Sequence, residues 1–199
     1  MVRAILDGNK TQTRRIIKPQ PVDNGDDITI RGHRGSADYL MREIAPRFWV
    51  RFAVGDVLWV REALQCDLME NFLTGERDTN AAVAYYAADD AEVVDRAGFN
   101  LAWAWKRGTL PAMFMPRAFS RITLKVTGVK VERLQDISEG DALAEGIERI
   151  RYPEVGDWGW PQQRYRDLWS SINGPGSWDA NPWVCAISFE RIPREAPTG

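Results

Sequence analysis

Residues 120–134 read SRITLKVTGVKVERL, a run in which apolar and polar residues alternate and β-branched residues are frequent. This period of two predicts a β-strand with one face toward a core. Gly128 interrupts the run near its middle, and a glycine inside a strand is typical of a bend or of a close backbone approach. The segment therefore predicts one long or bent strand around Gly128, and it is the best strand signal in the chain.

Shorter patterns of the same kind lie on both sides of this segment. Further strands are predicted at Lys10–Ile17, Val57–Glu62, Ala81–Ala87 and Trp183–Glu190, with an irregular polar segment over 65–80. Helices are predicted over residues 1–7, from the Ser138–Asp141 cap to Gly146, and over Gln162–Ile172. This combination predicts a mixed α+β barrel with two to three flanking helices, in a single domain spanning residues 1–199.

Composition narrows the classes of function. The net charge of −2 and the pI of about 5.6 do not favour an extended basic surface for long nucleic acid. One histidine, His33, and two cysteines, Cys66 and Cys185, are too few for a disulfide framework and disfavour a zinc site or a histidine-based triad. If the protein is an enzyme, we expect Lys, Thr, Ser, Asp or Glu to carry the chemistry, with no metal and no cofactor.

Hydropathy bears on the compartment. The apolar runs are short, and the N-terminal residues 1–6 lack the pattern of a signal peptide. We therefore expect a cytoplasmic protein with no membrane partner.

Residues 8–15 read GNKTQTRR, which resembles the GxKTxTxR signature of the ASCH family. Two further features follow in the family's order. Gly55–Leu58 resembles its turn before the next strand, and Ile137–Ile147 resembles its short helix after the long strand. The resemblance implies a PUA-like barrel, with insertions near 19–50 and 65–110.

A longer subgroup of this family, common in phages and prophages, is more similar still. It shares a WVRE-like strand end, an MPR…SR segment and an NPW before the last strand, which here are Trp59–Glu62, Met115–Arg117 with Ser120 and Arg121, and Asn181–Trp183. Members of this type usually have one more strand before the first helix, which here would precede Met1.

Small ASCH proteins include amidohydrolases that remove the acyl group from N4-acetylcytidine. The resemblance implies a catalytic set of Lys10 and Thr13 from the signature and Glu145 from the short helix. The last place is open to three other carboxylates, Glu139, Glu148 and Glu62. The function expected is a metal-independent amidohydrolase that acts on N4-acylated cytosine nucleosides or nucleotides.

Amide hydrolysis needs a nucleophile, a proton shuttle and stabilisation of an oxyanion. Thr13 either attacks the carbonyl or orients a water that does. Lys10 serves as base if burial, or a nearby cation such as Arg14 or Arg15, lowers its pKa. Glu145 either holds Lys10 in place or shuttles the proton to N4.

Further side chains are predicted to bind the substrate: Arg14, Trp59, Arg61, Glu62, Arg117 and Arg121. Of these, Arg61, Glu62, Arg117 and Arg121 lie where a strand begins or ends, which is the usual place for a site at the mouth of a barrel. Trp59 and Arg61 share a strand face and form either a platform for a base or a stacked structural pair.

The alternative function is a non-catalytic PUA-like module that binds RNA or modified DNA, against which the acidic pI counts. A nuclease is disfavoured because no histidine pair or acidic metal cluster is evident.

Overall fold

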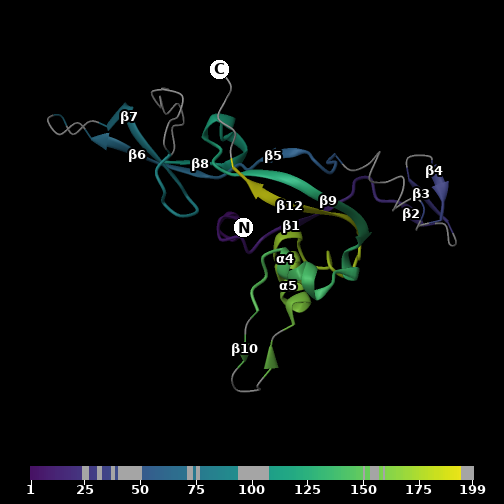
Figure 1. Ribbon diagram of the computed structural model, residues 1–199. Coiled ribbons are helices and arrows are strands. Elements are labelled where there is room, and N and C mark those ends of the chain that lie inside the picture. The colour runs from purple at the N-terminus through teal and green to yellow at the C-terminus, as the bar shows by residue number, and fades with distance from the viewer. Residues whose placement is uncertain are drawn as a thin grey trace. The chain divides into compact units, whose positions relative to one another are not determined.

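A computed structural model describes residues 1–23, 27–30, 33–36, 39, 51–70, 74, 77–93, 108–149, 151–152, 157–158 and 160–193 (Figure 1). The chain divides into two compact units. The first comprises chiefly Arg3–Val57 and Lys125–Arg191, and the second chiefly Leu58–Leu124. The second unit contains the whole of the segment near 65–110 that resembles an insertion, and the expectation of a single domain stays a prediction.

The elements of both units follow one another along the chain in this order: α1 (Val2–Leu6), β1 (Gln12–Ile16), β2 (Val22–Asp23), β3 (Ile28–Ile30), β4 (His33–Gly35), β5 (Val57–Trp59), β6 (Leu64–Glu70), β7 (Arg77–Tyr86), β8 (Thr109–Leu110), η2 (Ala112–Phe114), η3 (Arg117–Phe119), β9 (Thr123–Arg133), η4 (Leu134–Asp136), α4 (Glu139–Ala144), β10 (Arg151–Tyr152), β11 (Asp157–Trp158), α5 (Pro161–Asn173) and β12 (Trp183–Ile192).

The main sheet contains the long strand that the sequence predicts. Its strand order is β1-β12-β9-β5, and β1 pairs antiparallel with β12, with Gln12 opposite Ser188 and Ile16 opposite Val184. The long strand β9 passes through Gly128 without a break, as predicted, and the glycine lies against Ser188 of β12. β9 and β12 curve together, so the sheet is a curled antiparallel half-barrel (Figure 1). The fold is therefore mixed α+β with few helices.

The core of the first unit lies between this curled sheet and the helices α4 and α5. Buried side chains from strand, turn and helix meet there: Leu134, Ile137, Ala142, Tyr165, Trp169 and Val184. The apolar spacing that predicts a helix over 162–172 is the same spacing that places Tyr165 and Trp169 on its buried side. The three predicted helices are confirmed as α1, α4 and α5, and α5 begins one residue earlier than predicted, with Pro161 in its first turn.

The second unit has its own sheet and core. The sheet order is β7-β6-β8, and its buried side chains include Leu64, Tyr86 and Leu110. The irregular segment predicted over 65–80 is wrong, because β6 and β7 pair antiparallel from Leu64↔Tyr86 onward, with a bulge between Leu68 and Met69. Apolar and polar residues alternate from residue 64 to 68, which is the period of two expected of a β-strand, although the segment as a whole is polar.

The strand predicted at Val57–Glu62 is shorter than expected. β5 ends at Trp59, although the amide of Val60 still donates to the carbonyl of Ile122 at 3.0 Å. In the part of the chain that the structure describes, no helix has the length and apolar character needed to cross a bilayer.

We expect Leu134→Ala to destabilise the protein by about 2–5 kcal/mol, because it removes a buried side chain and leaves a cavity. Leu134 is 0% exposed and touches the helices and β12 through the core cluster. Urea unfolding followed by tryptophan fluorescence measures the change. Ile172→Ala, on the exposed side of α5, is the control and should stay within about 0.5 kcal/mol of the parent; equal effects of the two variants would contradict this assignment of the core.

Candidate functional site

Backbone contacts fix the position of Lys10 at the end of α4. The amide of Lys10 donates to the carbonyl of Ala4 at 2.8 Å, and Lys10 forms an isolated antiparallel bridge with Glu145. Gly146 follows with φ of +89°, and a Cβ there would come within 3.2 Å of the Cβ atoms of Ala4 and Lys10. The signature segment and the helix end can approach this closely because residue 146 has no side chain.

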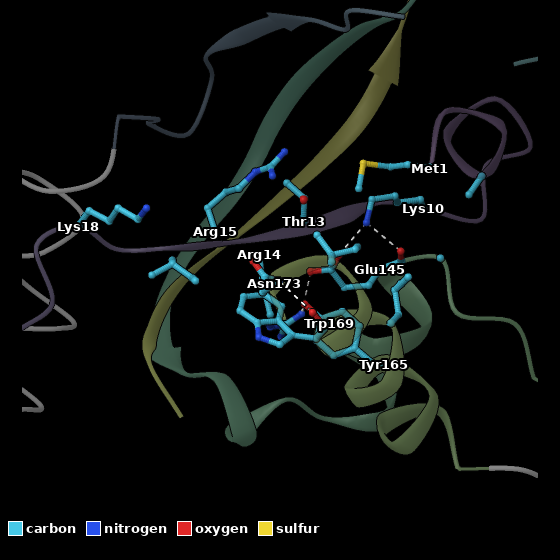
Figure 2. Close-up of a pocket in the computed structure, with 15 residues that line it drawn as sticks. Met1, Lys10, Thr13, Arg14, Arg15, Lys18, Glu145, Tyr165, Trp169 and Asn173 are labelled. Atoms are coloured by element: carbon cyan, nitrogen blue, oxygen red, sulfur yellow. Dashed lines mark hydrogen bonds and ion pairs between the residues drawn. The ribbon is translucent and has the colours of Figure 1, made fainter. Parts of the chain in front are cut away.

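Lys10 and Glu145 form a buried ion pair. The Nζ of Lys10 lies 2.6 Å from the Oε2 of Glu145, and each side chain is only 5% exposed (Figure 2). The same Nζ donates to the backbone carbonyl of Glu145 at 2.8 Å. Burial lowers the pKa of Lys10 below its ordinary value, assisted by the charges of Arg15 and Arg14 and opposed by Glu145. The lowering makes the Lys10 ammonium a stronger acid than that of an ordinary lysine, which is the direction that a proton donor needs.

Arg14 ties Glu145 to the interior of the unit. Its side chain is 0% exposed, and its guanidinium lies 2.7 Å from Glu132, 3.3 Å from Glu145 and 3.4 Å from Asp141. The Nζ of Lys130 lies 2.6 Å from the other carboxylate oxygen of Glu132, Oε2. This contact is an ion pair whose geometry is not that of a hydrogen bond. Three cations and three carboxylates therefore balance one another around the Lys10–Glu145 pair.

The cap of α4 belongs to this network. Ser138 and Asp141 form the reciprocal capping box that the sequence predicts. The Oδ1 of Asp141 also accepts a hydrogen bond from Gln12 at 3.1 Å, which links the helix start to β1. Burial alone would raise the pKa of Asp141, but hydrogen bonds from Ser138 and Gln12 and the charge of Arg14 lower it. Asp141 therefore acts as a fixed anion that positions α4 and its last residues.

A pocket of about 490 Å³ opens beside the ion pair. Its lining includes Lys10, Thr13 and Glu145 together with the aromatic side chains of α5, Tyr165 and Trp169 (Figure 2). Burial and the negative charge of Glu145 raise the pKa of Tyr165, so its hydroxyl stays protonated at neutral pH. The volume lies within the range of about 300–1,000 Å³ that is typical of small-molecule sites.

Thr13 lines this pocket, on the opposite side of β1 from Arg14. Figure 2 shows Thr13 and Arg15 together on one side of the strand, as the period of two requires. Among the described residues, the Thr13 hydroxyl makes no hydrogen bond to Lys10 or to Glu145. All three residues of the predicted catalytic set therefore line one pocket, and two of them are in direct contact.

The three alternative carboxylates lie elsewhere. Glu139, the first residue of α4, is exposed and pairs with Arg149 at 2.6 Å, and Glu148 is exposed in the segment after α4. Glu62 belongs to the second unit, where it pairs with Arg121. Of the four candidates, Glu145 is the one in contact with Lys10.

Four of the predicted substrate-binding residues contact one another in two pairs within the second unit. The guanidinium of Arg61 stacks on the ring of Trp59, 4.7 Å from its centroid, and donates to the carbonyl of Met113 at 2.9 Å. Glu62 is 1% exposed and binds Arg121 at 2.8 Å. Arg117, in η3, is exposed.

Arg121 has two further partners that the sequence analysis did not identify. Its guanidinium also pairs with Asp89 at 2.8 Å and lies 3.8 Å from the centroid of the Tyr86 ring. Glu62 and Asp89 raise the pKa of Arg121 despite partial burial, which alone would lower it. Because two carboxylates and an aromatic ring surround this guanidinium, its contacts are made within the second unit and support the structure of that unit.

Glu132 and Tyr165 are the residues of the first site that sequence reasoning missed. Glu132 lies 118 residues from its partner Arg14, and no local sequence pattern predicts a contact between residues so far apart in the chain. Tyr165 lies in the helix predicted over 162–172, where apolar spacing indicates a place in the core and does not indicate a pocket. Within the described residues, no three His, Cys, Asp or Glu side chains are grouped in a way that could hold a metal ion.

Comparisons with protein-family models, curated proteins and solved structures give no match to this chain.

We expect Arg14→Met to destabilise the protein by about 3–5 kcal/mol, because it leaves buried carboxylates without their shared cation. Arg14→Lys should recover only part of the loss, since an ammonium cannot bridge the three groups as a planar guanidinium does. Urea unfolding measures both. Arg166→Met removes an exposed arginine from α5 and should change stability by less than about 0.5 kcal/mol. Full recovery by lysine would mean that only the charge at position 14 matters.

Proposed function

We propose that this protein is a metal-independent amidohydrolase with a PUA-like fold of the ASCH type, and that it removes acyl groups from N4-acylated cytosine nucleosides or nucleotides. The observation that carries the proposal is the buried Lys10–Glu145 pair at 2.6 Å beside a pocket of nucleoside size. The cytosine substrate rests on the resemblance of residues 8–15 to the ASCH signature, and the pair supplies chemistry suited to that substrate.

The ion pair provides both a proton acceptor and a proton donor. Lys10 and Glu145 hold one transferable proton between them, which lies on the ammonium in the charged form of the pair. The carboxylate can then accept a proton from an attacking water while the ammonium faces the developing oxyanion. Because the pKa of Lys10 is lowered, its ammonium is a better acid than an ordinary lysine.

These roles give a balanced hydrolysis. Water adds to the acyl carbon and gives one proton to Glu145, forming a tetrahedral oxyanion beside Lys10. Lys10 then donates its proton to N4, the C–N bond breaks as the oxyanion collapses, and cytidine leaves with its free amine. Glu145 returns its proton to Lys10 across the 2.6 Å contact, which restores the pair, and the acyl group departs as a carboxylic acid.

Water is the nucleophile that the contacts favour. An activated hydroxyl lies within about 2.6–3.2 Å of its base, although this distance is often longer in a free enzyme. The Thr13 hydroxyl has no hydrogen bond to either member of the pair among the described residues. Thr13 therefore fits better as a wall of the pocket that orients the water or the acyl oxygen.

The alternative of a nucleic-acid-binding module receives less support from the same contacts. It would use Arg121 and Arg61 for phosphates or bases. Arg121 already binds Glu62 and Asp89, and Arg61 is stacked on Trp59, so both would have to exchange existing partners for a ligand.

We expect Lys10→Met and Glu145→Gln each to lower kcat/KM for N4-acetylcytidine by about 100- to 10,000-fold, the usual contribution of a general acid or base. The assay is cytidine release by EDTA-treated protein, followed by chromatography. Far-ultraviolet circular dichroism and urea unfolding show whether each variant is folded. No turnover by the folded parent protein would contradict the proposed activity.

Thr13 variants assign the nucleophile in the same assay. Thr13→Val should retain activity within about tenfold if water attacks, because the variant keeps the shape of the wall. A loss as large as that of Lys10→Met, restored by Thr13→Ser, would instead identify Thr13 as the nucleophile.

The pH profile tests the role of Lys10 separately. Loss of the shared proton at high pH removes the acid that protonates N4, so kcat/KM should fall on the alkaline side. Because the pKa of Lys10 is lowered from 10.5, the fall should begin below that pH. Arg15 contributes to the lowering, so Arg15→Gln should move the alkaline limb to higher pH, whereas Arg166→Gln should leave it in place. If the alkaline limb of the kcat/KM profile keeps its position in Arg15→Gln, this would argue against Lys10 as the titrating group.

A further inference from the structure

We infer that the substrate carries a phosphate on its sugar, and that Arg15 and Lys18 bind this phosphate at the rim of the pocket. The inference rests on the proposed function, since it specifies which N4-acylated cytosine compounds the site accepts. It starts from the distribution of charge around the pocket, which differs from that of the chain as a whole.

The pocket is basic although the chain is acidic. The net charge of the chain is −2. Among the described residues that line the pocket, four are basic (Lys10, Arg14, Arg15 and Lys18) and only Glu145 is acidic. Glu145 is occupied by Lys10 and Arg14, so it does not neutralise the rim. The local excess of positive charge therefore comes from Arg15 and Lys18.

Arg15 and Lys18 are available to a ligand. Both are exposed, and neither makes a side-chain hydrogen bond or an ion pair with another described residue. Arg14 and Arg121, by contrast, are bound by carboxylates of their own unit. Two unengaged cations on the rim of a pocket are suited to an anionic group, and an arginine beside a lysine matches the two charges of a phosphate monoester.

Lys10, Arg15 and Lys18 follow one another along the segment that contains β1, with Lys10 before the strand and Lys18 after it. Arg15 is close enough to Lys10 for its charge to lower the lysine pKa, and it lies on the same side of β1 as Thr13 (Figure 2). Lys18 follows two residues after the end of β1. A ligand whose acyl amide contacts Lys10 can therefore place a more distant anionic group along β1, while Trp169 and Ile172 of α5 provide an apolar wall.

The test compares N4-acetylcytidine with its 5′-monophosphate as substrates. We expect kcat/KM to be about tenfold or more higher for the monophosphate at low ionic strength, mainly through KM, and this preference to fall as salt is added. The double variant Arg15→Gln/Lys18→Gln should bring the ratio of the two kcat/KM values close to one. The ratio is informative because any effect of Arg15 on Lys10 acts on both substrates.

A charge-matched double variant controls for the loss of positive charge. Lys125→Gln/Arg166→Gln also removes one lysine and one arginine from exposed positions of the first unit, and neither residue lines the pocket. It should keep the preference for the monophosphate. A preference that disappears equally in both double variants would overturn the assignment to Arg15 and Lys18.

Binding of the products separates this inference from the proposed function. Calorimetric titration with cytidine 5′-monophosphate and with cytidine needs no turnover. Tighter binding of the monophosphate that depends on Arg15 and Lys18 would support the anion site even if no acylcytidine is hydrolysed. Hydrolysis without any preference for phosphate, or the absence of binding by both products, would overturn the inference. A dinucleoside monophosphate that contains N4-acetylcytidine can be compared in the same assay. If it loses its acetyl group faster than the mononucleotide does, the substrate would instead be the end of a nucleic acid.

Discussion

The guanidinium of Arg14 is the constraint on which the candidate site depends. A buried cation is tolerated only when anions surround it, and here they come from β9, from the start of α4 and from its last turn. These segments are more than one hundred residues from Arg14 in the chain, so their carboxylates meet only when the curled sheet has formed. The same contacts hold Glu145 in the position where it meets Lys10.

Local structure supports this arrangement at two points. The capping box fixes the start of α4, and Asp141 extends it to Gln12 and Arg14. At the other end of the helix, Gly146 allows the backbone to pass close to Lys10. The short helix is thus tied to β1 at its start and to Lys10, just before β1, at its end, which explains how six helical residues can place a carboxylate with little freedom.

Pairs of arginine and carboxylate side chains have different roles in the two units. In the second unit, Glu62 and Asp89 enclose Arg121 against Tyr86, and the cluster has the form of an internal support. In the first unit, the equivalent network leaves Lys10 at the wall of a pocket and leaves Arg15 and Lys18 at its rim. Whether a charged cluster can act on a ligand therefore depends on the cavity beside it, since the pairs themselves are alike.

The sequence by itself determined many of the local elements, although not the β6–β7 hairpin or the end of β5. Alternation predicted β9, and helix spacing together with capping residues predicted α4 and α5, because these signals depend on neighbours within a few residues. The resemblance of residues 8–15 to the ASCH signature pointed to Lys10, Thr13 and Glu145. It did not distinguish Glu145 from Glu139, Glu148 and Glu62, since nothing in a linear pattern states which carboxylate reaches a given lysine.

The tertiary structure decided those partnerships. It placed Glu145 against Lys10, enclosed Arg14 in carboxylates where a substrate contact was predicted, and brought Tyr165 of a core helix to the pocket. It also separated the Trp59–Arg61 and Glu62–Arg121 pairs into a second unit. The physical reason is that burial, and with it the pKa of Lys10, depends on side chains that are close in space but distant in the sequence.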